Sequence, residues 1–256
     1  MKRFLFSCCL LFGFGNMGLA SDCEPVSTLA LWTKGAGNYG KNHIPPQKLV
    51  TKKLKSFDYG IRKLHDRQYS NKARHYKVIS LRSVIDGYPL DPQVDGVLLH
   101  FANKMAVAVP LDDSVDKLSK IYMAREVKSK AGKWTRKFPA IHKRNPLLRD
   151  PRPLTFCGNK IVIDKKLGSV VNVKQGFDPF YYVSTLTGIE FINMKAMERQ
   201  FQVALGRPAK GARVFQNRCV YCHSVNGVGA DYGWDFVKPL PLYEKRSPQS
   251  LRFHVV

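Results

Sequence analysis

The sequence predicts an α+β fold, in which a mixed, mostly-β domain is followed by a short α-helical segment. Short apolar runs recur between residues 75 and 195, separated by Gly, Pro, Asn and Asp residues, a pattern typical of strands joined by turns. These runs do not alternate regularly with long helical patterns, as the βαβ units of a parallel sheet would. Helical spacing of apolar residues marks residues 194–205 and the stretch that follows. A chain of 256 residues is long enough for one sizeable core and a small appendage.

Residues 1–20 have the composition of a secretory signal peptide. Lys2 and Arg3 form a charged start, residues 4–19 are almost without charge, and a run of small residues ends at Ala20. A membrane anchor is the alternative, but two glycines and an asparagine interrupt the apolar run, which is short for a membrane span. We therefore expect cleavage after Ala20 and export of the chain, with the periplasm as its destination.

Residues 21–74 are predicted to form an N-terminal arm that is loop-rich over residues 21–46. Glycines and two adjacent prolines break any long element before residue 47. Residues 50–64 are basic, and their apolar side chains have close to helical spacing, which favours a helix, although Gly60 weakens that pattern. The apolar positions are Val50, Leu54, Phe57, Ile61 and Leu64.

A β-hairpin is the clearest element of the predicted domain at residues 75–195. Two β-prone runs, residues 96–101 and 105–110, flank the Asn-containing loop at residues 102–104. Alternating residues predict a strand before them, ending in the turn-like residues 86–89. The strands expected in this region outside the hairpin are residues 76–81, 160–164, 180–184 and 188–193.

Two helices are predicted around the later strands. Asp112 or Asp113 can cap the first, whose apolar stripe runs from Val115 to Tyr122. The second spans residues 194–205. Its apolar residues at four-residue intervals are better explained as core contacts than as cofactor ligands, and these are Met197, Phe201 and Leu205. The next residues, 206–210, resemble a linker.

Residues 219–223, Cys-Val-Tyr-Cys-His, form the attachment signature of a c-type haem. Two thiols three positions apart can each add to a vinyl group of the porphyrin, and the next residue can present an imidazole to the iron. A zinc half-site would require a second ligand pair. A thioredoxin-like pair would require a βαβ context, whereas the residues before Cys219 have helical spacing. We expect haem at Cys219 and Cys222, with His223 as an axial iron ligand, in agreement with export.

The remaining cysteines differ in their expected fates. Cys8 and Cys9 leave with the signal peptide. Cys23 and Cys157 remain in an oxidising compartment, where a Cys23–Cys157 disulfide and two free, buried thiols are both open alternatives.

The formal net charge of +23 is concentrated between residues 48 and 82 and between residues 125 and 152. In a protein of the cell interior, such charge would suggest nucleic-acid binding. Export and the lack of an aromatic–basic stacking motif argue against nucleic acid here. Three alternatives stay open: solvated basic faces, an acidic redox partner in the periplasm, and an anionic membrane surface.

Three short sequence segments resemble an oxidoreductase molybdopterin-binding-like (sulfite-oxidase-like) domain. They are residues 78–81, 95–99 and 188–190, and the resemblance covers residues 75–195. It implies an α+β fold and, as one alternative, a molybdopterin cofactor that serves oxidation of a small substrate. The molybdenum-binding cysteine motif of that family has no match here, and Cys157 is the one thiol inside the region. We interpret His100 and His142 as ordinary strand or loop histidines.

From Gly211 onward, the chain resembles a class I cytochrome c, and we assign residues 209–256 to a partial domain of that kind. Gly211, Phe215 and Cys219 share one helix face, and glycines follow the motif, as in that family. Trp234 stands where the family has a proline whose carbonyl orients the histidine, so we expect another group to orient His223.

The resemblance also implies a sixth iron ligand that the sequence lacks. No methionine follows His223, and the sequence ends before the position at which the family carries it, so we expect a truncated form of a longer relative. The iron is then five-coordinate, ligated by His254, or completed by another chain.

These features predict an electron-transfer protein that works through covalent haem. One alternative is an enzyme whose larger domain oxidises a small substrate while the haem removes the electrons. The other is a non-catalytic module, in which the sulfite-oxidase-like fold is a docking surface for a redox partner.

Overall fold

The computed structural model describes residues 28–33, 47–66, 68–69, 73–111, 117–141, 156–163, 180, 183–206 and 209–237. Among these residues the fold is mixed α+β with strands predominating, which confirms the predicted fold class at that level. No helix in the described ranges is long and apolar enough to cross a membrane.

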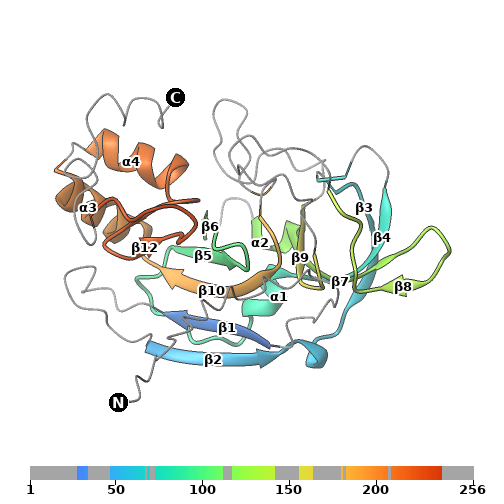
Figure 1. The fold of residues 1–256 in the computed structure, drawn as a ribbon. Coiled ribbons are helices and arrows are strands. Elements are labelled where there is room, and N and C mark those ends of the chain that lie inside the picture. The colour runs from blue at the N-terminus through green and yellow to red at the C-terminus, as the bar shows by residue number, and fades with distance from the viewer. Residues whose placement is uncertain are drawn as a thin grey trace, which may run out of the picture.

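The first sheet has five strands in the order β2-β1-β10-β5-β6 (Figure 1). They are β2 (Gln47–Lys53), β1 (Thr28–Thr33), β10 (Leu186–Ile192), β5 (Gly96–Phe101) and β6 (Ala106–Pro110). β1 runs parallel to β10, and the other neighbours are antiparallel. The predicted hairpin is thus confirmed as β5 and β6, and its turn includes Lys104 in the left-handed region at a φ of 63°.

The second sheet has the order β3-β4-β7-β8, with β9 also paired to β7. Its strands are β3 (Gly60–Leu64), β4 (Arg74–Ser80), β7 (Ile121–Lys128), β8 (Trp134–Thr135) and β9 (Lys160–Ile163). The strand pairs are antiparallel, and the strands predicted at residues 76–81, 160–164 and 188–193 correspond to β4, β9 and β10.

Short elements connect the sheets, and two longer helices follow them. The short ones are η1 (Leu54–Ser56), α1 (Leu81–Ile85) and α2 (Lys117–Lys120). The helix predicted at residues 194–205 is confirmed as α3 (Met194–Leu205). Asn193 caps its start by accepting from the Ala196 N–H at 2.7 Å, and Gly206 ends it in the left-handed conformation. α4 (Ala209–Arg218) leads into the motif, which β11 (Ser224–Val225) and β12 (Val228–Gly229) follow.

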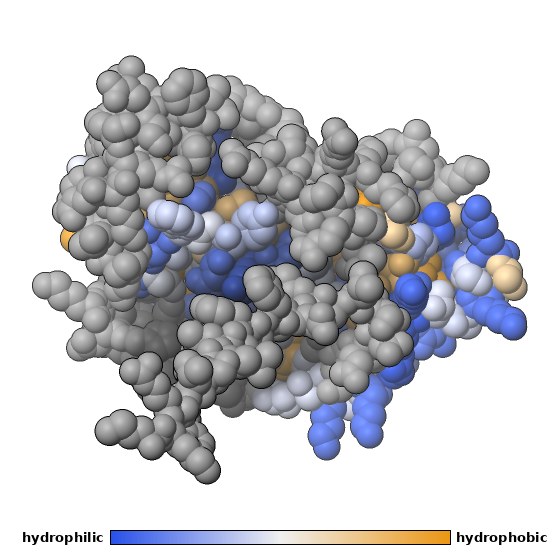
Figure 2. Space-filling view, in the orientation of Figure 1, coloured by the Kyte–Doolittle hydropathy of each residue, from blue (hydrophilic) through white to orange (hydrophobic). Residues whose placement is uncertain are grey.

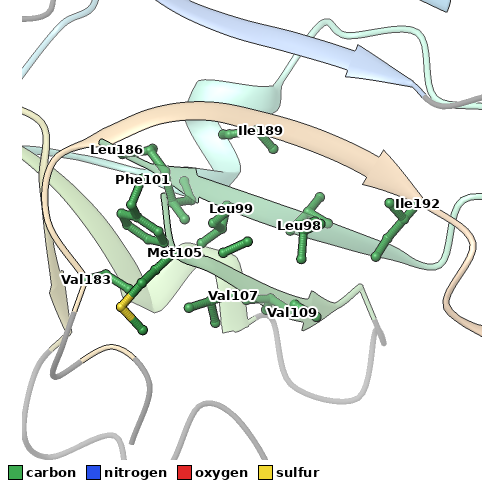
Figure 3. Packing of buried hydrophobic residues seen from close by; sticks show 14 of the residues in the cluster. Leu98, Leu99, Phe101, Met105, Val107, Val109, Val183, Leu186, Ile189 and Ile192 are labelled. Carbon is green, nitrogen blue, oxygen red and sulfur yellow. The ribbon is translucent and has the colours of Figure 1, made fainter. Parts of the chain in front are cut away.

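Two clusters of buried side chains form the core. The larger one joins the first sheet to α1, α3 and α4, and Figure 3 shows its Ile189, Leu99 and Val107 on the successive strands β10, β5 and β6. The smaller one lies against the second sheet and includes Tyr76, Phe138 and Phe156.

A buried ion pair lies beside the smaller cluster. The Lys160 ammonium contacts an Asp66 carboxylate oxygen at 2.5 Å, and the two side chains are 0% and 2% exposed. The Lys160 nitrogen also lies 5.1 Å from the Tyr69 ring centre and 4.9 Å from that of Phe156. Burial lowers the pKa of Lys160, while the neighbouring Asp66 acts in the opposite direction.

The helix predicted at residues 50–64 is wrong, because this stretch forms β2, η1 and β3. Its apolar side chains do not share one face: Leu54 is 4% exposed, whereas Ile61 is 61% exposed. The loop-rich arm is also corrected, since β1 lies inside the first sheet between β2 and β10.

Two further predicted elements differ from the structure. The helix expected to reach Tyr122 ends at Lys120 as α2, because Ile121 begins β7 and pairs with Ile163. The strand expected at residues 180–184 is not observed, since the described residues 183–184 lie outside any strand. Asp112 and Asp113 are outside the described residues.

His100 lies in strand β5. Its Nε2 lies 2.8 Å from the buried Glu190 carboxylate, and its ring stacks near Trp32 at a centroid distance of 5.1 Å. His142 lies outside the described residues.

Candidate haem-attachment site

One turn at the end of α4 carries all three motif side chains. The Cys219 N–H donates to the Phe215 carbonyl at 2.8 Å, and the His223 N–H donates to the Cys219 carbonyl at 2.8 Å. These are i to i−4 bonds, so Cys219, Cys222 and His223 emerge within about one helical turn. The predicted helix before Cys219 is confirmed as α4.

Both motif cysteines are free thiols and half-buried against the larger core. Burial raises the pKa of Cys219, an effect that the Arg218 guanidinium opposes. Burial, together with the neighbouring Cys219, raises the pKa of Cys222 to about 11. Both groups are therefore protonated at neutral pH, which slows thiolate-dependent oxidation in the folded chain.

The His223 ring is oriented by a backbone carbonyl. Its Nδ1 lies 2.9 Å from the Trp234 carbonyl oxygen, which can only accept, so Nδ1 carries the proton and donates. The lone pair of the neutral ring is then on Nε2, the atom available to a metal. The expectation that a group other than residue 234 would orient His223 is wrong. The bond uses the main chain, which tryptophan supplies as well as proline does.

Gly233 and Phe236 fix the position of the same ring. A Cβ on Gly233 would lie 2.5 Å from His223 Cε1 and 2.6 Å from Nδ1, so a side chain there would displace the imidazole. The Phe236 ring meets the His223 ring edge to face at a centroid distance of 4.9 Å. The imidazole is therefore held by a hydrogen bond, a glycine and an aromatic ring.

Asp235 organises the loop after the motif. Its carboxylate accepts from the Gly227 N–H at 2.7 Å, the Val237 N–H at 2.7 Å and the Ser224 hydroxyl at 3.0 Å. This single side chain satisfies donors in β11, in the β11–β12 turn and in the chain after the hairpin. This role cannot be predicted from the sequence, because a lone aspartate carries no spacing signal.

The motif is anchored to the rest of the fold by aromatic packing and by backbone bonds. The Phe215 ring lies between Phe201 of α3, at 5.0 Å, and Phe236, at 5.2 Å. The Ala106 N–H of β6 donates to the Tyr221 carbonyl at 3.2 Å, and the Asp231 N–H donates to the Lys104 carbonyl at 3.0 Å. The motif turn therefore lies against the tip of the β5–β6 hairpin.

The remaining candidate residues are Cys157, which the structure describes, and Cys23 and His254, which lie outside the described residues. Cys157 is disulfide-bonded, so its sulfur does not provide a thiolate ligand for molybdenum. Its expected partner, Cys23, lies outside the described residues, and the Cys23–Cys157 pairing stays a prediction. His254, the signal peptide and residues 238–256 lie outside them as well.

The residues that could hold a metal are also limited within the described ranges. There, no group of three or more His, Cys, Asp or Glu side chains is placed to bind an ion, so these ranges offer no second ligand pair beside the motif cysteines. No protein-family model matches the chain, and no curated protein or solved structure matches it. The functional interpretation therefore depends on the geometry of the turn.

Proposed function

We propose that this chain is an extracytoplasmic electron-transfer protein with one covalent haem c. Cys219 and Cys222 hold the porphyrin through thioethers, and His223 Nε2 is an axial ligand of the iron. The observation that carries the proposal is the His223 Nδ1 bond to the Trp234 carbonyl. It selects the tautomer that a ligating histidine needs, within the turn that carries two free thiols.

Each residue has a separate part in this function. The haem supplies a one-electron couple between ferrous and ferric iron. Donation from Nδ1–H to a carbonyl raises the basicity of Nε2 and so strengthens its bond to the metal. Phe236 and Gly233 limit rotation of the ring, which keeps Nε2 aimed in one direction.

Several finer features belong to the same proposal. Residues 75–195 form a sulfite-oxidase-like domain, residues 209–256 form a partial cytochrome c domain, and export delivers both to the periplasm. His254 is the candidate for the sixth ligand. The disulfide at Cys157 removes the one thiol of the larger domain that could have bound molybdenum, which favours electron transfer over molybdopterin-dependent oxidation.

The test is to express the full chain with export and haem-attachment machinery and to stain a denaturing gel for haem. The wild-type chain should retain haem under denaturing conditions and gain the mass of one haem. The C219S/C222S variant should retain none, because no thioether can form. The matched control, Cys157→Ser, removes a cysteine outside the motif and should keep the haem.

A colourless wild-type chain at the mass of the bare mature polypeptide would overturn the proposal. Equal haem loss from the Cys157→Ser control would show that the stain follows folding rather than attachment. His254→Ala then tests the sixth ligand. If His254 binds the iron, the ferrous spectrum should change from low-spin to high-spin and respond sharply to carbon monoxide.

A further inference from the structure

A second surface of the molecule combines strong positive charge with exposed apolar side chains. Five basic side chains are exposed on β3, at the end of β7 and in the β7–β8 turn: Arg62, Lys63, Lys128, Lys130 and Lys133. We call them the basic end. Residues 128–137 contain no Asp or Glu, so this turn has no acidic side chain of its own to balance its charge.

Strand pairing brings these residues to one end of the second sheet. Lys63 of β3 pairs with His75 of β4. Tyr76, which follows His75, pairs with Val127 of β7. Lys128, which follows Val127, pairs with Trp134 of β8. Residues separated by as many as 71 positions therefore line the same end of the sheet. Figure 2 shows hydrophilic side chains gathered at the end of the molecule where Figure 1 draws β8.

Apolar groups accompany the charges. Ile61 is 61% exposed on the edge strand β3, where it pairs with Lys77. The Lys77 ammonium lies 5.0 Å from the centre of the Trp134 ring, which is half-buried, and also pairs with Glu126 at 2.8 Å. Lysines and arginines beside an exposed isoleucine and a tryptophan suit a lipid interface, where the charges meet phosphates and the apolar groups enter the headgroup boundary.

The position of the basic end favours a bilayer over a redox protein as its binding partner. In Figure 1, β8 and β3 lie at one end of the molecule, and α4 and β12, which flank the haem motif, lie at the other. A redox partner must approach the haem to exchange electrons with it. A partner bound at the basic end would be far from the motif, whereas a membrane has no need to contact it.

We infer that the basic end docks this protein onto a bilayer of anionic phospholipids. In this orientation the motif turn faces away from the lipid, open to a soluble redox partner. Only the role of this orientation in electron transfer rests on the proposed function, since lipid binding itself needs no haem.

The experiment measures sedimentation of the full-length exported protein with phosphatidylglycerol–phosphatidylcholine vesicles. Wild-type protein should bind them, should not bind pure phosphatidylcholine vesicles, and should be released by salt. One basic residue near an anionic surface contributes about 1 kcal/mol, about fivefold in partitioning, so K130E/K133E should lose at least about 25-fold.

A matched control distinguishes lipid binding by the basic end from attraction due to the net charge of the whole protein. K195E/R199E changes two exposed basic residues of α3, at the other end of the molecule, and alters the net charge by the same amount. It should bind anionic vesicles within about twofold of wild type. Ile61→Thr, on the exposed strand edge, should lose a few-fold by removing apolar contact while the charge is unchanged.

Three results would overturn the inference: equal loss in the two double variants, wild-type binding to neutral vesicles as strong as to anionic ones, or no binding to anionic vesicles at low salt. Haem content measured on the same samples keeps this test independent of the proposed function. A chain without haem that still binds anionic vesicles supports docking and contradicts only the electron-transfer role.

Discussion

The motif turn and the Lys160–Asp66 pair are two polar sites packed against apolar core clusters, and different groups hold them in place. At the turn, main-chain carbonyls of Phe215, Cys219 and Trp234 accept the bonds that set its geometry. In the pair, two charged side chains satisfy each other with almost no access to water. Side-chain identity should therefore matter little at residue 234 and greatly at residue 160.

The largest expected effect is at the buried pair. Lys160→Met leaves the Asp66 carboxylate buried without its cation, which should lower the free energy of unfolding by about 3–5 kcal/mol. Urea denaturation of the wild-type and variant proteins measures this loss.

The double variant K160M/D66L is the control for that prediction. It removes both charges, so most of the lost stability should return. A loss below about 1 kcal/mol in Lys160→Met alone would show that the pair is not a structural requirement and would remove the contrast between the two sites.

An intermediate effect is expected at Gly233. A Cβ in Gly233→Ala would collide with the His223 ring, so the free energy of unfolding should fall by about 1–3 kcal/mol. If the proposed haem is attached, the displaced imidazole should ligate the iron less well, which a visible spectrum would report as more high-spin haem.

Gly60→Ala is the matched control, because a Cβ at Gly60 meets nothing within 4 Å and the backbone there is not left-handed. It should leave both the spectrum and the stability unchanged. An unaltered spectrum in Gly233→Ala would mean that the ring does not need the space above that glycine.

The smallest effect is expected at Trp234, whose side chain is 56% exposed. Trp234→Ala retains the carbonyl that accepts from His223 Nδ1, so the haem spectrum should be unchanged and stability should stay within about 0.5 kcal/mol of wild type. A spectrum resembling that of Gly233→Ala would show that the indole, and not the main chain, orients the ligand.

The parts of the fold that the sequence predicts are those with local signals. The β5–β6 hairpin follows from two β-prone runs around a short loop, and α3 follows from helical spacing between Asn193 and Gly206. The motif turn follows from three residue types in fixed order. In each case, the interactions that form the element join residues close together in the chain.

The parts that the sequence misses depend on distant partners. β1 is a strand because it pairs with β10, which lies more than 150 residues later, and Ile121 leaves a helical pattern to pair with Ile163. Asp66 and Lys160 meet across 94 positions. The spacing of apolar residues cannot indicate such pairings, since they depend on the tertiary context of each strand.

The contact of the motif with β6 has a consequence for solubility. Among the described residues β6 is the last strand of the first sheet, and an edge strand of this kind can recruit a strand from another molecule. At the start of that edge, the Ala106 N–H donates to the Tyr221 carbonyl, and the neighbouring Lys104 carbonyl accepts from the Asp231 N–H. The folded motif segment thus covers the start of this edge, and a chain in which the segment folds late would expose a longer edge to pairing with another molecule.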